Sequence, residues 1–186
     1  STKLFSNGVY LNLYPSLFCK FFILDKIYSF WIFFSSSNGV SLERLYILES
    51  IPATNLNLRS KTPLRTTPKL ELVDPSLAIA ALDLNKQDLV NDLNLTGFLF
   101  ENMCIRDLKI YADAMNASLS YFRDKNDFEV DVILRNANGK WGAIEIKLGA
   151  GYINEAANNL LKFKERVDIE KCGEPSFLMV LTGADY

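Results

Sequence analysis

The sequence EVDVILRNANGKWGAIEIK, residues 129–147, decides the fold of this chain. It contains two short apolar runs separated by Asn-Ala-Asn-Gly, and within each run polar residues occupy alternate positions. Alternation with a period of two is typical of β-strands, and Asn-Gly between two such runs is a strong turn signal. We therefore predict a β-hairpin with strands at 128–134 and 141–148.

The length of the hairpin turn determines which charged residues share a face. A two-residue loop at 138–139 would place Asp131 opposite Ile146 and separate the carboxylates of Asp131 and Glu145. A three-residue loop at 137–139, with its glycine left-handed in a bulge, pairs Asp131 with Glu145 and leaves their Cβ atoms about 5 Å apart. Both loops suit the sequence, and we predict the longer one because it places the charged side chains of Asp131 and Glu145 on one face.

Strict alternation on the first strand would place Val130 and Val132 on one face and Asp131 and Ile133 on the other. Buried carboxylates need a compensating cation. One interpretation is a salt bridge from Lys147 to Asp131 or Glu145. The other is a Mg²⁺ or Mn²⁺ ion held by Asp131, Glu145 and the Ile146 carbonyl, with Lys147 beside the reacting water. The spacing alone leaves both open.

The composition excludes several classes of site. The chain has 186 residues, of which 49% are hydrophobic and 23% charged, as in a globular protein. It contains no histidine, which excludes catalytic triads and His-ligated zinc. Its three cysteines lack a CxxC spacing, so we expect reduced thiols and a cytoplasmic protein. The net charge of -2 gives no overall attraction for nucleic acid, which would need a local patch.

Residues 1–40 differ from the rest of the chain. They hold seven of the 13 phenylalanines and no alanine or glutamate. Their densest apolar stretch, 17–34, is interrupted by Lys20, Asp25 and Lys26, which argues against a membrane span. We interpret residues 1–40 as a non-native or appended segment outside the core.

Residues 41–73 are interpreted as a connector, and 74–186 as the folded domain. The connector would begin with a helical turn and continue as a turn-rich basic stretch. A nucleic-acid or subunit contact would explain this stretch, and a solvated linker explains it more simply. Its basic residues are Arg59, Lys61, Arg65 and Lys69.

The domain should begin with a short helix capped by Asp74 and Pro75, followed by a long helix at about 96–116. Plotting the long helix at 100° per residue puts Asn102 on its solvent face and Phe98 on its apolar stripe. Glu101 falls within the apolar stripe. It is either a functional acid or a first-turn acid that the helix dipole favours.

Further along, we predict a strand at 118–123, a helix at 153–167 and a strand at 176–183. The last strand is continuously apolar, as expected of a buried central strand, and should run parallel to 141–148. The fold class is therefore α/β, with a mixed sheet flanked by helices.

Four ordered motifs resemble one family. They are KTPLRTTPKLELVDPSLAIAAL, GFLFENM, YFRDKNDFEVDVIL and AIEIKLG, at 61–82, 97–103, 121–134 and 143–149. The D…ExK arrangement, with an acid on the preceding helix, is similar to the PD-(D/E)xK nuclease superfamily. More narrowly, the motifs resemble the uncharacterised C-terminal domain of bacterial and archaeal AAA-type ATPases, which is a numbered domain-of-unknown-function family.

The resemblance implies a restriction-endonuclease-like fold and Mg²⁺-dependent (or Mn²⁺-dependent) hydrolysis of nucleic acid. Its tetrad would be Glu101, Asp131, Glu145 and Lys147, with metal at Asp131, Glu145 and Ile146. Arg123 also matches the pattern, without an assigned role. The partners implied are nucleic acid and an ATPase module; the ATPase module and winged helix that precede this domain in the family are not visible here. The alternative is a non-catalytic DNA-docking or protein-interaction domain.

Overall fold

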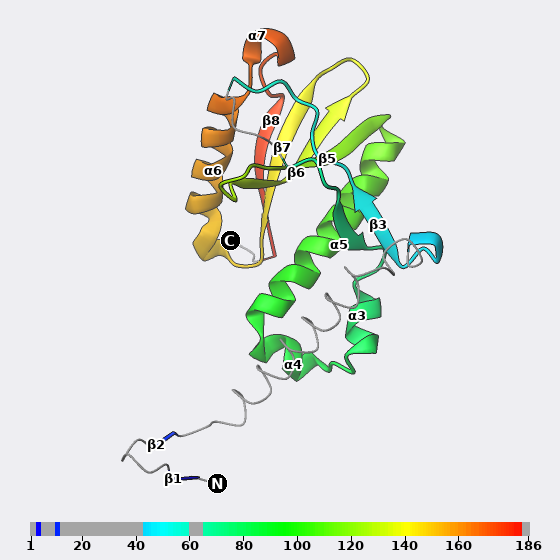
Figure 1. Cartoon of the computed structure of the whole chain (residues 1–186), viewed down its shortest axis with the longest axis vertical. Helices are drawn as coiled ribbons and strands as arrows, with labels where there is room; N and C mark the ends of the chain where they lie inside the picture. Colours follow the sequence, from blue (N-terminus) through cyan, green and yellow to red (C-terminus); the bar gives the residue numbers. More distant parts are fainter. Residues whose placement is uncertain (1–2, 5–9, 12–42, 60–64, 184–186) are drawn as a thin grey trace. The chain divides into compact units, whose positions relative to one another are not determined.

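A four-stranded mixed sheet forms the centre of the structure, which is a computed structural model that describes residues 3–4, 10–11, 43–59 and 65–183 (Figure 1). Leu45–Tyr186 form one compact unit. The second and third strands of the sheet form the predicted hairpin, and the fourth runs parallel to the third, as predicted. The first strand pairs antiparallel with the second. In spatial order the strands are β5 (Ala117–Arg123), β6 (Glu129–Asn136), β7 (Trp141–Lys147) and β8 (Phe177–Thr182).

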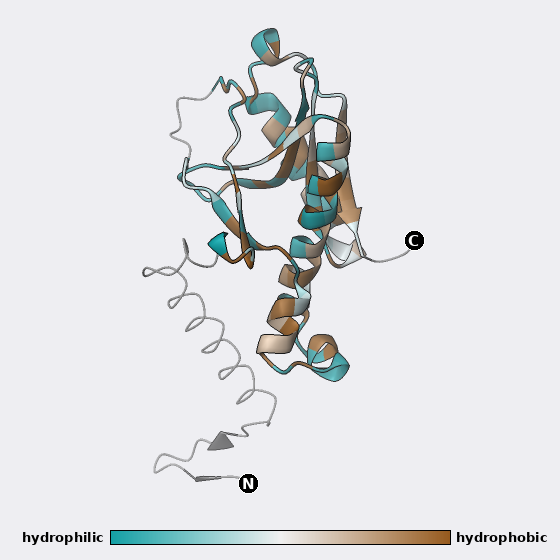
Figure 2. Cartoon of the chain, turned by 90° about the vertical axis from the view of Figure 1, so that its right-hand side faces the viewer, coloured by the Kyte–Doolittle hydropathy of each residue, from teal (hydrophilic) through white to brown (hydrophobic). Residues whose placement is uncertain are grey.

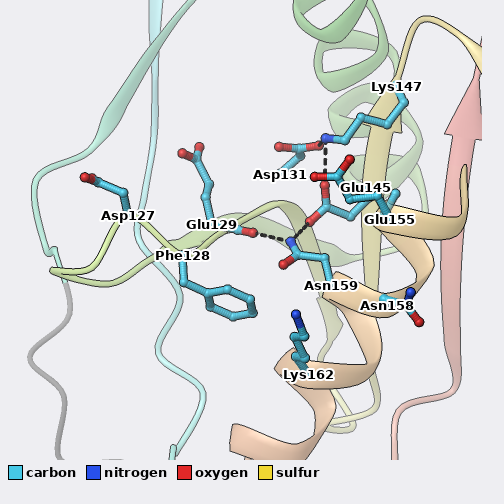
Figure 3. Close-up of a pocket in the computed structure, with 11 residues that line it drawn as sticks. Asp127, Phe128, Glu129, Asp131, Glu145, Lys147, Glu155, Asn158, Asn159 and Lys162 are labelled. Atoms are coloured by element: carbon cyan, nitrogen blue, oxygen red, sulfur yellow. Dashed lines mark hydrogen bonds and ion pairs between the residues drawn. The ribbon is translucent and has the colours of Figure 1, made fainter. Parts of the chain in front are cut away.

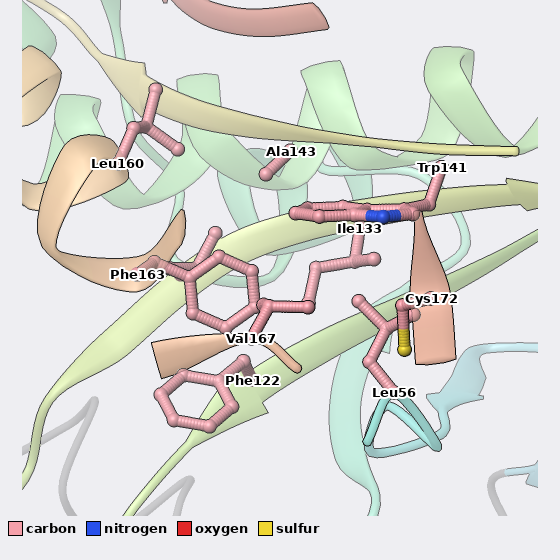
Figure 4. Packing of buried hydrophobic residues seen from close by; sticks show 10 residues of the cluster. Leu56, Phe122, Ile133, Trp141, Ala143, Leu160, Phe163, Val167 and Cys172 are labelled. Atoms are coloured by element: carbon pink, nitrogen blue, oxygen red, sulfur yellow. The ribbon is translucent and has the colours of Figure 1, made fainter. Parts of the chain in front are cut away.

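Two helices cover the two faces of this sheet, which makes the fold α/β. Helix α5 (Leu93–Ala114) packs against one face and α6 (Ile153–Arg166) against the other. Neighbouring residues of β7 show the two faces, because Ala143 belongs to the core cluster on the α6 side and Ile144 to the cluster on the α5 side. The α6-side cluster centres on aromatic rings: Phe122, Trp141 and Phe163 (Figure 4).

Short helices connect these elements. They are α3 (Ser76–Ala81), α4 (Lys86–Asn91), η2 (Ala150–Tyr152) and α7 (Ile169–Cys172). The predicted helix start is present, since Asp74 Oδ1 accepts the Ser76 N–H at 2.9 Å. None of the helices in the described ranges is both long enough and apolar enough to cross a bilayer.

The stretch expected to be a solvated connector is instead a packed part of this unit. It contains strands β3 (Leu48–Ile51) and β4 (Lys69–Leu72), which pair antiparallel. Ile51 is only 2% exposed and joins the α5-side core. The solvated-linker interpretation was therefore wrong at β4, and the helical turn expected at the start of the connector gives way to strand β3. The pairing partners of these strands are distant in sequence and leave no local pattern. Lys61 lies outside the described residues.

The solvent-facing and core-facing sides predicted for helix α5 were partly wrong. Asn102, expected in solvent, is 5% exposed because β4 lies against that side: its amide donates to the Leu72 carbonyl at 3.1 Å. Phe98, expected in the core, is 70% exposed. The N-terminal part of α5, which carries Phe98, extends beyond the sheet together with α3 and α4, and it presents hydrophobic residues there (Figure 2).

Strand β8 was expected to be central, but it is the last strand in the described sheet order and therefore lies at its edge. Its alternating pattern of partly buried and exposed residues agrees with that position. The expectations for residues 1–40 fall outside the described residues. Within residues 1–40 the structure describes two strands of two residues each, β1 (Lys3–Leu4) and β2 (Tyr10–Leu11), which pair with each other.

Candidate functional site

The β6–β7 turn has the predicted three-residue loop. Val132 pairs with Ile144, and the Asn136 N–H donates to the Lys140 carbonyl at 2.9 Å. Gly139 has a φ of 80°, the left-handed conformation that glycine adopts without a Cβ penalty. The Asn136 side chain also accepts the Lys140 N–H at 3.0 Å, which closes the turn. The register prediction is confirmed.

The alternation predicted for β6 was wrong at one point. Ser120 pairs with Ile133 and Phe122 with Val130, so β6 contains one residue more than β5 between these pairs. This irregularity is the geometry of a β-bulge, which re-aims side chains. Val130 consequently packs on the α6 side and Val132 on the α5 side.

The bulge gives Asp131 an unusual hydrogen bond. Its Oδ2 accepts the buried Ile146 backbone N–H at 2.7 Å, where a regular ladder would present a strand carbonyl. This bond fixes the carboxylate against β7 and leaves Asp131 only 7% exposed. The Ile146 backbone therefore contributes to the site through its N–H in this structure.

Lys147 joins the two predicted carboxylates. Its Nζ lies 2.8 Å from Glu145 Oε2 and 3.4 Å from Asp131 Oδ2 (Figure 3). Glu145 is 2% exposed. The prediction that Asp131, Glu145 and Lys147 come together is confirmed, and the bulge contributes to this arrangement, which alternation alone does not describe.

Asn159 on α6 is a residue that the sequence analysis missed. Its Nδ2 donates to Glu145 Oε1 and to the Glu129 carbonyl, the latter at 2.8 Å (Figure 3). Both oxygens of Glu145 are thus hydrogen-bonded. The available signal was its spacing three residues after the buried Ala156, which places it beside the buried stripe of α6.

The environment of Glu145 favours its neutral form. Burial, followed by repulsion from Asp131, raises its pKa from 4.5 to about 7, although Lys147 and Asn159 act in the opposite direction. The pKa of Lys147 lies above its ordinary value because attraction from Asp131 and Glu145 outweighs the effect of burial. A carboxyl that titrates near neutral pH in a cavity is a common property of functional sites.

An open cavity of about 690 Å³ lies in front of these groups. Its described lining has more acids than bases, with five carboxylates and two lysines. The remaining lining includes Phe128, Asn158 and Asn159 (Figure 3). The charged lining residues are Asp127, Glu129, Asp131, Glu145, Glu155, Lys147 and Lys162.

Glu101 is not among the lining residues of this cavity, but its partner Lys69 also contacts Glu129, which lines the cavity. Because α5 begins at Leu93, Glu101 lies beyond the first turn, and the first-turn interpretation was wrong. Its Oε1 accepts a hydrogen bond from Lys69 Nζ at 2.6 Å. Burial and repulsion from Asp131 raise the pKa of Glu101 above its ordinary value, even though Lys69 lowers it.

From the sequence, Lys69 was expected in a basic stretch that is either a solvated linker or a nucleic-acid or subunit contact. In the structure it is the first residue of β4, and its ammonium contacts three carboxylates, those of Glu71, Glu101 and Glu129. Two lysines therefore share the neutralisation of these acids. Lys69 offsets Glu101, and Lys147 faces Asp131 and Glu145.

The donor chemistry at Asp131 and Glu145 fits Mg²⁺ or Mn²⁺, which take one or two carboxylates and keep several waters. Within the described ranges, no three acidic or cysteine side chains form a ready-made metal cluster. A metal would therefore bind with few protein ligands, and the Lys147 ammonium would have to leave its position between the carboxylates.

Arg123, for which the resemblance gave no role, lies at the end of β5. Its Nη2 pairs with Asp127 at 2.8 Å and its Nη1 with Glu129 at 3.5 Å. Both acids line the cavity. Arg123 therefore ties the β5–β6 loop to the start of β6 at the cavity edge.

One comparison with known proteins found a domain-of-unknown-function family, which is the kind of family that the sequence motifs resemble. A search of curated proteins and a search of solved structures each found no match. Residues 96–185 match the family described as Domain of unknown function (DUF4143), and this match covers α5 except its first three residues, the four strands of the mixed sheet, and α6. The segment that carries the candidate site is thus similar to a domain-of-unknown-function family, DUF4143.

Proposed function

We propose that this domain hydrolyses phosphodiester bonds of nucleic acid with the help of a divalent metal ion. The observation that carries the proposal is the convergence of two buried carboxylates, Asp131 and Glu145, on the Lys147 ammonium beside an open cavity. Carboxylates that bind a cation and a lysine that stabilises developing negative charge are the parts such a reaction needs.

The charge of the cavity supports a requirement for metal. With five carboxylates and two lysines, the described lining would repel an anionic phosphodiester. A divalent cation at Asp131 and Glu145 would reduce this repulsion, polarise a phosphoryl oxygen and lower the pKa of a bound water. We therefore expect substrate binding to depend on metal.

Each protein residue then has a defined task. Asp131 and Glu145 hold the cation, and Asn159 keeps the Glu145 carboxylate oriented from α6. Lys147, on its flexible four-carbon stem, moves off the carboxylates and stabilises negative charge on the phosphate or orients the attacking water. Glu101 assists from α5 through water.

The resemblance to the C-terminal domain of AAA-type ATPases supplies the proposed setting, which is an ATPase module or subunit as partner. A second candidate is a non-catalytic DNA-docking or protein-interaction domain. One observation favours it: Lys147 already pairs with both carboxylates, so the cluster is partly neutralised without a metal.

A cleavage assay separates the two candidates. The full chain would be incubated with plasmid DNA, single-stranded DNA and single-stranded RNA in the presence of Mn²⁺. The Lys147→Met variant should lose about 100-fold or more of the rate, because its charge is needed at the reacting phosphate. Lys164→Met is the matched control, since Lys164 on α6 pairs with Glu174 and does not line the cavity. Metal binding without cleavage would favour the docking domain.

A further inference from the structure

Lys69 lies at the centre of a second charged cluster. Its Nζ is 2.6 Å from Glu101 Oε1, 3.2 Å from Glu71 Oε1 and 3.6 Å from Glu129 Oε1. These acids come from α5, β4 and β6, and all four side chains are largely buried. The cluster therefore joins three elements through a single ammonium.

The second cluster is electrostatically connected to the candidate site. Glu101 experiences the charge of Asp131, and this repulsion contributes to its raised pKa. Glu129 lines the cavity, and its carbonyl accepts the amide of Asn159, which also holds Glu145. A change at Lys69 can thus reach the site by a short path through Glu101.

The positive charge of Lys69 offsets the repulsion among the carboxylates that surround it. Burial alone would lower the pKa of Lys69, but attraction from Glu101, Glu71 and Glu129 raises it above its ordinary value, so the ammonium stays charged. Without this charge, Glu101 would face Glu71 and Asp131 with no nearby cation among its described contacts. Its carboxylate would then take up a proton or turn away.

The backbone around Glu101 has a separate anchor. Asn102, the next residue of α5, donates to Glu71 Oε2 at 2.7 Å and to the Leu72 carbonyl at 3.1 Å. The contact between β4 and α5 therefore does not depend on Lys69 alone. Removing the ammonium should disturb the Glu101 carboxylate more than the fold.

We propose that Lys69 is a positioning residue of the site, which holds the Glu101 carboxylate near the cavity-lining Glu129 so that Glu101 can orient water for the reaction. The inference deepens the proposed hydrolase function and rests on it. It assigns to the β3–β4 hairpin, which lies before residues 96–185, a role in the chemistry of the domain.

A double-mutant cycle between Lys69 and Glu101 tests this inference. The cleavage rate of a single-stranded DNA oligonucleotide in Mn²⁺ would be measured for full-length Lys69→Met, Glu101→Gln and the double variant. Lys69→Met should lower kcat about 10-fold with little change in KM, since it removes an interaction needed at the reacting water. In the Glu101→Gln background the same change should have no further effect, because Lys69 acts through Glu101.

Two further variants separate positioning from stability. Lys69→Arg keeps the charge and should restore most of kcat. Lys109→Met removes an ion pair with Glu49 between β3 and α5, away from the cavity, and should leave kcat unchanged. An equal loss in Lys109→Met, or effects of Lys69→Met and Glu101→Gln that multiply, would overturn the inference.

The outcomes also separate this inference from the proposed function. A wild type that cleaves while Lys69→Met is equally fast overturns only the role of Lys69. A wild type without cleavage in any metal overturns the hydrolase and the positioning role together. If Lys69→Met does not fold, Glu101→Gln decides alone: a wild-type kcat in that variant would show that there is no catalytic carboxylate for Lys69 to position.

Discussion

At the scale of single residues, the burial of Glu145 beside Asp131 has a consequence for stability. Its folded-state pKa of about 7 lies above the ordinary value of 4.5, so between these values the folded protein binds a proton that the unfolded chain does not. Its contribution to the free energy of unfolding is therefore present at low pH and is lost as the pH rises towards 7.

Glu145→Gln should remove this dependence. Relative to wild type, the variant should gain about 1–3 kcal/mol in the free energy of unfolding between pH ~5 and pH ~8, because glutamine does not titrate. Urea unfolding in EDTA at several pH values measures it. Glu155→Gln, an exposed acid of the same cavity, is the control and should follow wild type. Parallel curves for wild type and Glu145→Gln would contradict the assignment.

Asp131 supports the fold as well as the site. Asp131→Ala leaves the buried Ile146 N–H without its acceptor and should cost about 1–3 kcal/mol of stability. Asp131→Asn keeps an oxygen in that place and should cost less. Thermal unfolding without metal compares the two. Equal stability of Asp131→Ala and wild type would show that the Ile146 hydrogen bond contributes nothing.

The sequence predicted some of these residues and not others, for physical reasons. Asp131, Glu145 and Lys147 lie on adjacent strands of one hairpin, so the turn length was enough to predict that they come together, whereas the bulge that brings Asp131 to the Ile146 N–H was not predicted. Lys69 and Asn159 reach the site through packing between distant elements. A basic residue in a polar stretch has the same local pattern whether it is solvated or buried among acids.

At the scale of elements, the β6–β7 turn sets the register on which the site depends. Gly139→Ala should destabilise the protein by about 1 kcal/mol or more, because alanine is strained at a φ of 80°. Gly151→Ala is the matched control, since Gly151 has no positive φ and an added Cβ would meet nothing within 4 Å. The melting temperatures of both variants, by circular dichroism, provide the test, and an equal shift would contradict it.

The sequence pattern of each element predicted whether it is a helix or a strand, but it predicted less well which neighbours pack against it. The strands and long helices of the domain appear where their periodicity indicated. The bulge on β6, the buried side of α5 at Asn102 and the edge position of β8 all depend on a neighbouring element. Periodicity indicates which side of an element is apolar, but it does not reveal which other element packs against each side.

At the scale of the whole molecule, the α/β class was predictable, whereas the β3–β4 hairpin was not. These strands are four residues each, and Leu48 pairs with Leu72 across a long loop. Residues of this region nevertheless complete the core, since Ile51 of β3 and Leu56 of the segment after β3 each join one of the two clusters. Strands this short are recognised only from their pairing and packing in the folded structure.

Leu45–Tyr186 form a compact unit, so a chain beginning at Ser41 should fold by itself. We expect it to unfold in urea in one cooperative transition, because both core clusters lie within that range. A broad, non-cooperative transition would show that residues before Ser41 are required for the fold.

The central claim is that Asp131 and Glu145 form a site for a divalent cation. Calorimetric titration of Mn²⁺ into the full chain at neutral pH tests it most directly, with Asp131→Asn as the variant that keeps the Ile146 acceptor and removes one charge. We expect one site in the wild type and at least about a 10-fold loss of affinity in Asp131→Asn. Absence of binding in the wild type, or equal affinity in the two proteins, would contradict it.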